Sequence, residues 1–380
     1  MRIAIIGAGP GGLYLAYLLR RARPDWGIEI LEQNAPDTTF GFGLAFSKMA
    51  LDFLEKEDTE TLAAILPAMR RWSDSVLFLN GERIRIDGMD YAGIGRLKLL
   101  EILTARAESV GIAPQFGRRI ESFSELGNPD LIVGADGANS ILRRAHETAF
   151  GTTQSLLTNR FAWYGTRKEF GALCHTFIET PRGFFNAHHH PHAQGMSTFV
   201  VEMDEATFLK NGFDTMPLEK TKPILEDIFG ETLGGEPLIS NNSIWRRFPK
   251  IRSTRAFYGN CVLLGDALHT AHFSIGSGTR LALEDAIALA HAVLSQPDLS
   301  AALAAYESAR LPRLEKLLAA ADASAQWYEN FPAHMRLAPL DFAYSYITRS
   351  GRVDLNRLRQ SSPEFAAAYE TRISTGKAHP

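Results

Sequence analysis

Residues 3–32 of the chain read IAIIGAGPGGLYLAYLLRRARPDWGIEILE. A short β-branched run precedes a cluster of glycines, apolar residues at helical spacing follow, and a second apolar run ends in Glu32. This order predicts a strand, a helix and a parallel strand, with Gly7, Gly9 and Gly12 at the first turn. There, free N–H groups and the helix dipole face a pyrophosphate, and Glu32 can accept a hydrogen bond from a ribose hydroxyl. The stretch therefore predicts dinucleotide binding, without separating NAD from FAD.

The same residues also resemble a secretory signal, because one Arg precedes a long apolar run. Two features oppose that interpretation. The glycines of GAGPGG interrupt the hydrophobic region, and LRRARPDW follows where a signal needs a small-residue cleavage site. We therefore favour a nucleotide-binding turn and expect a cytoplasmic protein.

The composition is that of an ordinary globular protein. The 380 residues are 45% hydrophobic and 22% charged, which is enough for two modest domains with buried cores. A formal net charge of −3 provides no basic field for nucleic acid or anionic membranes. The two cysteines, Cys174 and Cys261, have no disulfide or zinc spacing, and no apolar stretch reaches the roughly 20 residues that span a bilayer. We expect neither nucleic-acid nor membrane partners.

Two later segments end predicted strands with an acid. LIVGADGANSILRR predicts a strand at about 130–137 that ends near Asp136, although a purely structural Asp-Gly turn is the alternative. In LLGDALHTAHFSIGSGTRLALEDA, an apolar strand ends at Asp266, and a Gly-rich turn leads into a predicted helix over 279–294. The N-terminus of that helix carries partial positive charge, which suits an anionic reduced flavin. This pattern favours FAD.

Three segments resemble, in order along the chain, the three fingerprints of FAD-dependent aromatic hydroxylases of the para-hydroxybenzoate hydroxylase type. They are GAGPGG, GADGANSILR, and LLGDALH with GSG and LEDA. Arg96 in GRLKLLEIL and the sequence YESARLPR at 306–313 also match that family. One position departs, because Phe273 stands where the family usually has Pro. This variant, with FGFGLAFS and GFFNAHHHPHAQGMSTFVVE, resembles a subgroup of salicyloyl-CoA 5-hydroxylases, 2-aminobenzoyl-CoA monooxygenases and violacein-pathway hydroxylases of tryptophan-derived indoles.

The expected fold class is α/β: a Rossmann-like FAD-binding domain with a GxGxxG motif, an inserted antiparallel β-sheet substrate domain, and C-terminal helices. Helices are expected at about 48–72 and 95–110, and antiparallel strands over about 158–204. The expected division is 1–72, 92–157 and 250–318 for the FAD-binding domain, 73–91 and 158–249 for the substrate domain, and 319–380 for the C-terminal helical region.

The resemblance implies which residues contact a tightly bound FAD. The first motif and the end of the second strand are expected to hold the ADP half of FAD. Arg96 and the two strand-ending acids are expected to contact the pyrophosphate and the ribityl chain. Two glycine-bounded loops are expected to flank the flavin ring. The residues are Gly7, Gly9, Pro10, Gly11, Gly12, Glu32, Gln33, Gly43, Phe46, Arg96, Asp136, Asp266, Gly276, Ser277 and Gly278.

The run His188-His189-His190-Pro191-His192 suggests either a sheet-face cluster or, at His188, a substrate contact. We expect no metal there, because alternate side chains of a strand point to opposite faces and the run contains no acid. His272 is a second candidate for positioning substrate, with loop support as the alternative. The candidate aromatic pocket is formed by Trp163, Phe185, Phe199 and Phe273, although aromatics at strand spacing are more often core.

The implied reaction is aromatic hydroxylation through a C4a-hydroperoxyflavin, with O2 and transiently bound NADH or NADPH as cosubstrates. An aryl-CoA such as salicyloyl-CoA, hydroxylated at position 5, is the expected substrate, and a tryptophan-derived indole or a free aromatic acid is the alternative. A non-catalytic FAD-binding redox sensor and an NAD-dependent dehydrogenase are alternatives of another class. A monomer or homodimer is expected.

Overall fold

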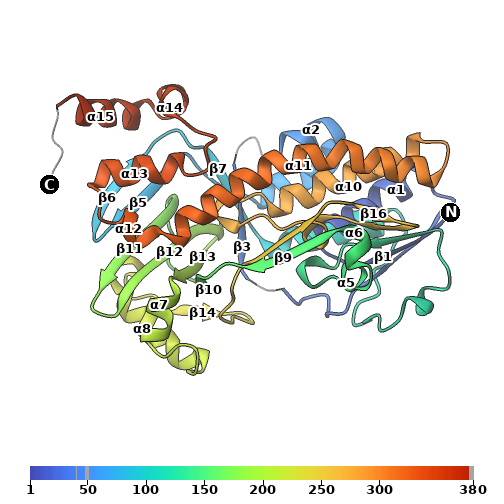
Figure 1. Cartoon of the computed structure of the whole chain (residues 1–380), viewed down its shortest axis with the longest axis horizontal. Helices are drawn as coiled ribbons and strands as arrows, with labels where there is room; N and C mark the ends of the chain where they lie inside the picture. The colour runs from blue at the N-terminus through green and yellow to red at the C-terminus, as the bar shows by residue number, and fades with distance from the viewer. Residues whose placement is uncertain (40, 48–50, 376–380) are drawn as a thin grey trace.

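The computed structural model describes residues 1–39, 41–47 and 51–375 and contains two large β-sheets (Figure 1). The first sheet has five strands in the order β16-β17-β8-β1-β2. Their bounds are β1 Arg2–Ile6, β2 Gly27–Leu31, β8 Leu131–Gly134, β16 Phe257–Tyr258 and β17 Cys261–Leu263. All neighbouring pairs are parallel except β16 with β17. The predicted strand-helix-strand unit at the N-terminus is confirmed.

Long helices bury this sheet and explain its apolar strands. Helix α1 (Pro10–Ala22) packs against α10 (Gly278–Ser295) and α4 (Arg96–Ser109). The strands and these helices share one large hydrophobic core, in which Ile5 and Leu15 are inaccessible to solvent. Because both faces are covered, the strands are continuous apolar runs rather than alternating ones.

The second sheet has seven strands in the order β14-β10-β13-β12-β11-β5-β6. Their bounds are β5 Ser75–Leu79, β6 Glu82–Ile86, β10 Arg160–Thr166, β11 Leu173–Thr180, β12 Gly183–Ala193, β13 Met196–Met203 and β14 Leu238–Ser240. The sheet is antiparallel, as predicted for 158–204, except that β11 pairs with β5 in parallel. Residues 75–86 thus join this sheet from a distant part of the sequence.

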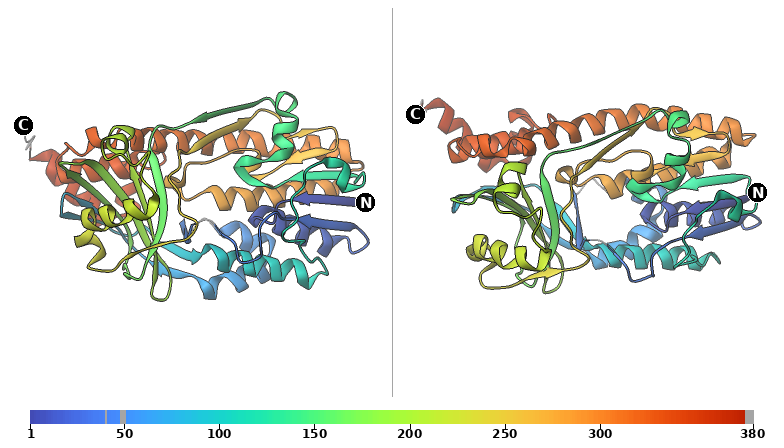
Figure 2. Two further views of the ribbon diagram at one scale, coloured as in Figure 1. Left: turned by 90° about the horizontal axis from the view of Figure 1, so that it is seen from below. Right: turned by 60° about the horizontal axis from the view of Figure 1, so that its bottom comes forward.

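Different helices cover the two faces of the seven-stranded sheet. One face packs against α7 (Glu205–Lys210), α8 (Leu218–Ile228) and α9 (Gly230–Leu233). The C-terminal end of α11 packs on the other face, with α12 Phe331–His334, α13 Pro339–Thr348, α14 Leu355–Ser361 and α15 Pro363–Ser374. Helix α11 (Leu299–Glu329) runs from the core of the first sheet to that of the second, and Figures 1 and 2 show it lying along both.

Two small sheets connect the large ones. One small sheet has three strands, β3 Gly43–Ser47, β7 Tyr91–Gly95 and β4 Arg70–Trp72. The other small sheet has two strands, β9 Thr152–Leu156 and β15 Pro249–Ser253. The remaining helices are α2 Asp52–Glu57, α3 Thr59–Ile65, α5 Ile141–Ala145 and α6 Glu147–Phe150, with 3₁₀ turns at Leu66–Ala68, Phe123–Leu126, Gly137–Asn139, Gly265–Ala267 and Phe273–Ile275.

The helix predicted at 48–72 is only partly correct. Residues 48–50 lie outside the described residues, two short helices occupy 52–65, and 70–72 form a strand that pairs with β7. Helix α3 ends at Ile65 and is followed by the 3₁₀ turn Leu66–Ala68, which contains Pro67, because a proline ring is not compatible with an α-helix interior. Sheet membership supports the predicted division into domains, which remains a proposal. Residues 376–380 of the predicted C-terminal helical region lie outside the described residues.

Candidate functional site

The glycines after β1 shape an open turn at the N-terminus of α1. Gly7 has φ +107°, and a Cβ there would lie 2.5 Å from the carbonyl oxygen of Ala135, so only glycine fits. Around a Cβ at Gly9, by contrast, the nearest atom would be 3.7 Å away. Pro10 is the first residue of α1, where its missing N–H costs nothing. The turn therefore has free space at Gly9, in front of the helix N-terminus.

Gly11 and Gly12 have a different role from Gly9. A Cβ at Gly11 would meet Leu264 and Ala282, and one at Gly12 would overlap the Gly7 carbonyl. Both glycines therefore allow α1 to pack against neighbouring elements. The α-carbon of Gly11 thus packs on Leu264, which follows β17, and on Ala282 of α10, and its predicted contact with the cofactor stays a prediction.

Glu32, at the end of β2, is held close to the glycine turn. Its carboxylate accepts hydrogen bonds from the backbone N–H of Ala8 at 2.9 Å and from both nitrogens of Asn34 at 2.9 and 2.7 Å. The neighbouring Gln33 is exposed. A carboxylate fixed in this way is preorganised to accept a further hydrogen bond from a ribose hydroxyl.

Asp136, after β8, has one satisfied and one unsatisfied oxygen. Oδ2 accepts the Ile141 N–H at 2.7 Å at the start of α5, whereas Oδ1 is buried and meets no hydrogen-bond donor within the described residues. Burial raises the pKa of this carboxyl. Nearby, the buried guanidinium of Arg143 donates to the carbonyl of Ala267 at 3.0 Å. Arg143 thus joins the second motif to the third.

Asp266, after β17, is exposed to solvent, yet the surrounding protein raises the pKa of its carboxyl. His269 and Arg96 oppose this rise in the Asp266 pKa. This combination indicates a side chain in an open recess. Arg96 begins α4, its N–H donates to Phe42 at 2.7 Å, and burial lowers the pKa of its guanidinium. Asp266 and Arg96 thus belong to different elements, and the charge of each affects the pKa of the other.

The two predicted ring-flanking loops meet in the structure. Gly276 has φ +59°, and a Cβ there would lie 3.0 Å from the carbonyl oxygen of Ala45. Gly43 packs so closely on His192 of β12 that a Cβ would overlap its side chain. Ser277 directly precedes α10, which begins at Gly278, and its hydroxyl donates to the carbonyl of Ile275. Phe46 is 2% exposed in the core, so its side chain points away from the loop surface.

These features fit a bound dinucleotide. Space in front of the α1 N-terminus suits a pyrophosphate, and Asp136 Oδ1 is a buried acceptor in need of a donor. The loops around Gly43 and Gly276 lie where the first and second sheets meet, beside the histidines of β12.

The face of the seven-stranded sheet that contacts the third motif carries aromatic and titratable side chains. Phe273 lies 5.8 Å from Trp163 and 5.4 Å from His188 between ring centroids, and both Phe273 and Trp163 are only half-buried. His188 stacks on Tyr328 of α11 at 4.9 Å. Trp163, His188 and Phe273 thus form one wall.

Two predicted pocket residues do not belong to this wall. Phe185 and Phe199 are inaccessible to solvent and lie in the core against α7–α9, on the opposite face of the sheet. Strand alternation explains the difference, since Phe185 is three residues from His188 on β12, and Phe199 neighbours the Val200 that pairs with His188.

His272 has a structural contact of its own. Its Nδ1 lies 2.8 Å from Ser274 Oγ and accepts the Ser274 N–H at the start of a 3₁₀ turn. Burial lowers the pKa of His272 to about 4. Along the histidine run, His188 and His189 point to opposite faces, toward Tyr328 and Phe199 respectively. Within the described part of the chain, no group of three His, Cys, Asp or Glu residues could hold a metal ion.

Comparison with known proteins agrees with this geometry. A family model described as an FAD binding domain matches residues 128–321. A salicyloyl-CoA 5-hydroxylase from a Streptomyces species is 41% identical, over 92% of this chain and 70% of its own. A 3-hydroxy-4-methyl-anthranilyl-(aryl-carrier protein) 5-monooxygenase from Streptosporangium sibiricum is 34% identical, over 87% of this chain and 90% of its own.

The chain belongs to the FAD-dependent aromatic monooxygenases. Its fold is that of a solved probable FAD-dependent monooxygenase from Pseudomonas aeruginosa, with a TM-score of 0.67 over 90% of this chain and 98% of that one, at 19% identity. FAD is thus the cofactor of this monooxygenase, and NAD(P)H is the reductant typical of the family. Among the described helices, none is long and apolar enough to cross a membrane.

The sequence analysis missed Glu202, which lies beside His188 in the monooxygenase. Glu202 on β13 is 1% exposed, and its Oε2 lies 3.6 Å from His188 Nε2. Asn159 donates to its other oxygen at 2.8 Å. Burial raises the pKa of Glu202 to about 7, whereas burial and then Arg349 lower that of His188 to about 3. The available signal was strand spacing. Glu202 lies two residues after Val200 on β13, and Val200 pairs with His188, so the side chains of Glu202 and His188 are on the same face of the sheet.

A second missed group supports the third motif of the monooxygenase. Asp285 on α10 accepts the Gly265 N–H at 2.9 Å, lies 2.8 Å from His269 Nε2, and accepts Arg310 Nε at 2.7 Å. LEDA and YESARLPR contain Asp285 and Arg310, but the motifs alone assigned them no role. These buried contacts fix the backbone beside Asp266.

Proposed function

We propose that this monooxygenase hydroxylates the aromatic ring of an aryl thioester of the salicyloyl-CoA kind. The observation that carries the proposal is the buried pair His188 and Glu202, which lies beside the half-buried Phe273 and Trp163. Two relatives support the substrate class, because their names place an aromatic acyl group on CoA or on a carrier protein and the reaction at position 5.

In this proposal the first and second motifs hold the nucleotide half of FAD. Gly9 leaves room for the pyrophosphate, Glu32 accepts from the ribose, and Asp136 Oδ1 accepts a further donor. Arg96 and Asp266 contact the pyrophosphate and ribityl chain. Gly43, Gly276, Ser277 and Gly278 allow the backbone to approach the ring. Held by these residues, FAD would supply the redox chemistry, which is acceptance of a hydride from NAD(P)H and delivery of one oxygen atom of O2 to the aromatic ring, with the other oxygen released as water.

The chain's own residues orient the substrate and exclude water. Phe273 and Trp163 present half-buried ring faces, on which an aromatic ring can stack. Phe161 packs behind them at 4.9 Å from Phe273 and is buried. An apolar wall here keeps bulk water from the reacting carbon.

The His188 and Glu202 pair receives a proton from a ring hydroxyl of the substrate. His188 is neutral at pH 7 and can accept or donate at Nε2, which meets no hydrogen-bond partner among the described residues. Glu202 has a pKa of about 7, close to the operating pH that favours proton transfer. Loss of the hydroxyl proton makes the ring more electron-rich, which promotes electrophilic oxygen transfer.

A substrate comparison tests the proposal. FAD-loaded enzyme is mixed with NADH or NADPH and with salicyloyl-CoA, salicylate or a tryptophan-derived indole acid, and NAD(P)H oxidation and hydroxylated product are measured. We expect a higher kcat/KM for the thioester, with a 5-hydroxy product. Equal stimulation and product formation with free salicylate would contradict the thioester assignment. Cytoplasmic location and assembly as a monomer or homodimer belong to the same proposal and are checked by cell fractionation and size-exclusion chromatography.

A further inference from the structure

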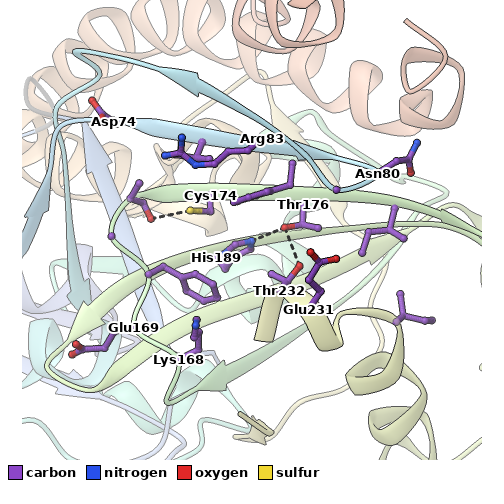
Figure 3. Close-up of a pocket in the computed structure, with 18 of the residues that line it drawn as sticks. Asp74, Asn80, Arg83, Lys168, Glu169, Cys174, Thr176, His189, Glu231 and Thr232 are labelled. Atoms are coloured by element: carbon purple, nitrogen blue, oxygen red, sulfur yellow. Dashed lines mark hydrogen bonds between the residues drawn. The ribbon is translucent and has the colours of Figure 1, made fainter. Parts of the chain in front are cut away.

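A cavity of about 910 Å³ lies on the face of the seven-stranded sheet opposite His188 (Figure 3). Strands β5, β11 and β12 contribute its floor, where Val76, Cys174, Thr176 and His189 lie. Residues of α8 and α9 and the loop at 168–172 form its sides. The volume is in the range of small-molecule binding sites. We call this space the far-face cavity.

The far-face cavity exists because the helices on this face cover only part of the sheet. The core beneath α7–α9 is made by alternate residues of β10, β12 and β13, such as Phe199 and Val201. On the adjacent β5 and β11 the equivalent residues, among them Val76 and Cys174, line the cavity instead. The cavity is therefore separated from the wall of Phe273 and His188 by the thickness of the sheet.

Two cations reach the far-face cavity without an ionic partner. Among the described residues, the side chains of Arg83 and Lys168 form no ion pair or hydrogen bond, and Figure 3 places them on opposite sides of the cavity. Two nearby acids are already engaged: Asp74 pairs with Arg85 at 2.7 Å, and Glu169 accepts the Gly195 N–H at 2.5 Å. Arg83 and Lys168 are thus available to an anion.

Polar groups also converge on the floor. His189 is inaccessible to solvent, its Nε2 lies 2.9 Å from Thr176 Oγ1, and Thr232 reaches the same oxygen at 3.5 Å. If Thr232 donates to Thr176, then Thr176 donates to His189, and Nδ1 carries the imidazole proton. That Nδ1 is buried and meets no acceptor within the described residues. A buried donor without a partner favours an occupant with an acceptor.

We propose that the far-face cavity binds a small organic anion with an apolar body, at a site separate from the flavin-side substrate. The anionic group lies between Arg83 and Lys168, as charge complementarity requires. The apolar body lies over Val76, Phe78 and Phe170, which line the same cavity. Glu231, which Figure 3 places toward the Asn80 end, faces any donor group of the ligand.

Calorimetry with 8-anilinonaphthalene-1-sulfonate tests the site, because this probe joins an aromatic body to one anionic group. FAD-loaded wild type, the double variant Arg83→Gln/Lys168→Gln and the control Arg119→Gln are titrated. Arg119 pairs with Glu121 at an exposed site, and neither residue lines the cavity, so this control tests loss of a cation elsewhere on the surface. We expect binding to the wild type and the control, and binding at least about tenfold weaker in the double variant. Absent binding, or equal binding in all three proteins, would overturn the proposal.

Alkylation of the two cysteines locates the probe independently of any variant. Cys174 lines the cavity, whereas Cys261 lies in β17 of the other sheet. Iodoacetamide labelling of the FAD-loaded wild type, read by peptide mass spectrometry, is compared with and without the probe. We expect the probe to slow labelling of Cys174 and to leave Cys261 unchanged. Unchanged labelling of Cys174 at a saturating probe concentration would show that the probe binds elsewhere, and would also overturn the proposal.

Discussion

Glu202 Oε2 lies 3.6 Å from His188 Nε2, and both atoms are buried and meet no hydrogen-bond partner among the described residues. The two residues are on adjacent strands, β13 and β12, where Asn186 pairs with Glu202 and Val200 with His188. Asn159 holds the other Glu202 oxygen in place. Such a buried, half-satisfied pair is costly for folding alone, which points to a role with substrate.

Replacing Glu202 tests this role through the pH profile. The Glu202 pKa of about 7 means that the carboxylate forms as pH rises through neutrality. We expect the wild-type kcat for hydroxylation to rise with pH, with a midpoint near pH 7. In Glu202→Gln this rise should be absent, and kcat at the upper plateau should be roughly 10²-fold lower than in the wild type. Product formation under saturating NAD(P)H from about pH 5 to 9 measures it. A Glu205→Gln control, at a partly exposed pair with Arg160, should keep the wild-type profile.

The glycine turn gives a prediction that separates folding from cofactor binding. Gly9 has φ −71° and room for a Cβ, so Gly9→Ala should fold normally but lose FAD, because the methyl group lies where the pyrophosphate is expected. Gly7→Ala should destabilise the protein itself, since φ is +107° there.

The flavin content of purified protein, from absorbance, and the unfolding temperature measure the two effects. Gly230→Ala is the matched control, because a Cβ there would have no atom within 4 Å and the residue lies in the helix α9. It should keep both FAD and stability. Full FAD occupancy in Gly9→Ala would refute the assignment of the turn.

The Asp285 contacts predict a pH-dependent loss of stability. Burial alone would raise the Asp285 pKa, but His269, Arg310 and the Gly265 N–H outweigh it and lower that pKa. A lowered pKa stabilises the fold above the usual carboxyl pKa of about 4, and this contribution disappears as pH falls through the folded-state pKa. Asp285→Asn should therefore lower the free energy of unfolding by about 3 kcal/mol or more at pH 7, and by less at acidic pH.

Denaturant titrations at several pH values measure this difference. Asp74→Asn is the control, because Asp74 pairs with Arg85 at a more exposed site. Its cost should be no more than about 1 kcal/mol. A loss in Asp285→Asn that is equal at pH 7 and below pH 4 would show that packing, not ionisation, is responsible.

The nucleotide-binding half was predictable because its signals are local. The glycine spacing and the apolar runs of the buried parallel strands can be read within 30 residues, and Gly12 is required by the nearby Gly7 carbonyl. The contact of Gly7 with Ala135, after β8, is the exception. Asp136 and Asp266 follow such strands directly. Carboxyl ends of parallel strands lie at one edge of a sheet, so these positions followed from the order of elements.

The substrate face was less predictable because it depends on register. Which of Phe185 or His188 faces the flavin side follows from the covering helices rather than from β12 itself, although their odd spacing already excluded a shared face. Glu202 was missed because a glutamate in an alternating strand suggests an exposed face. In the structure it is buried beside His188 and Asn159, and Asn159 also donates to the carbonyl of Tyr328 on α11, far along the chain.

The division of the four predicted pocket aromatics gives the last prediction. Phe273 is half-buried in the wall beside His188, whereas Phe199 is inaccessible and packs on Phe229 at 5.4 Å. Phe273→Leu should keep the fold but raise KM and lower the product formed per NAD(P)H, because the ring that orients substrate and excludes water is lost. Phe199→Leu should cost about 1 kcal/mol of stability and leave that product yield unchanged. Hydroxylated product per NAD(P)H consumed, with unfolding temperature, distinguishes them. Loss of product yield in Phe199→Leu would show that substrate reaches the opposite face of the sheet.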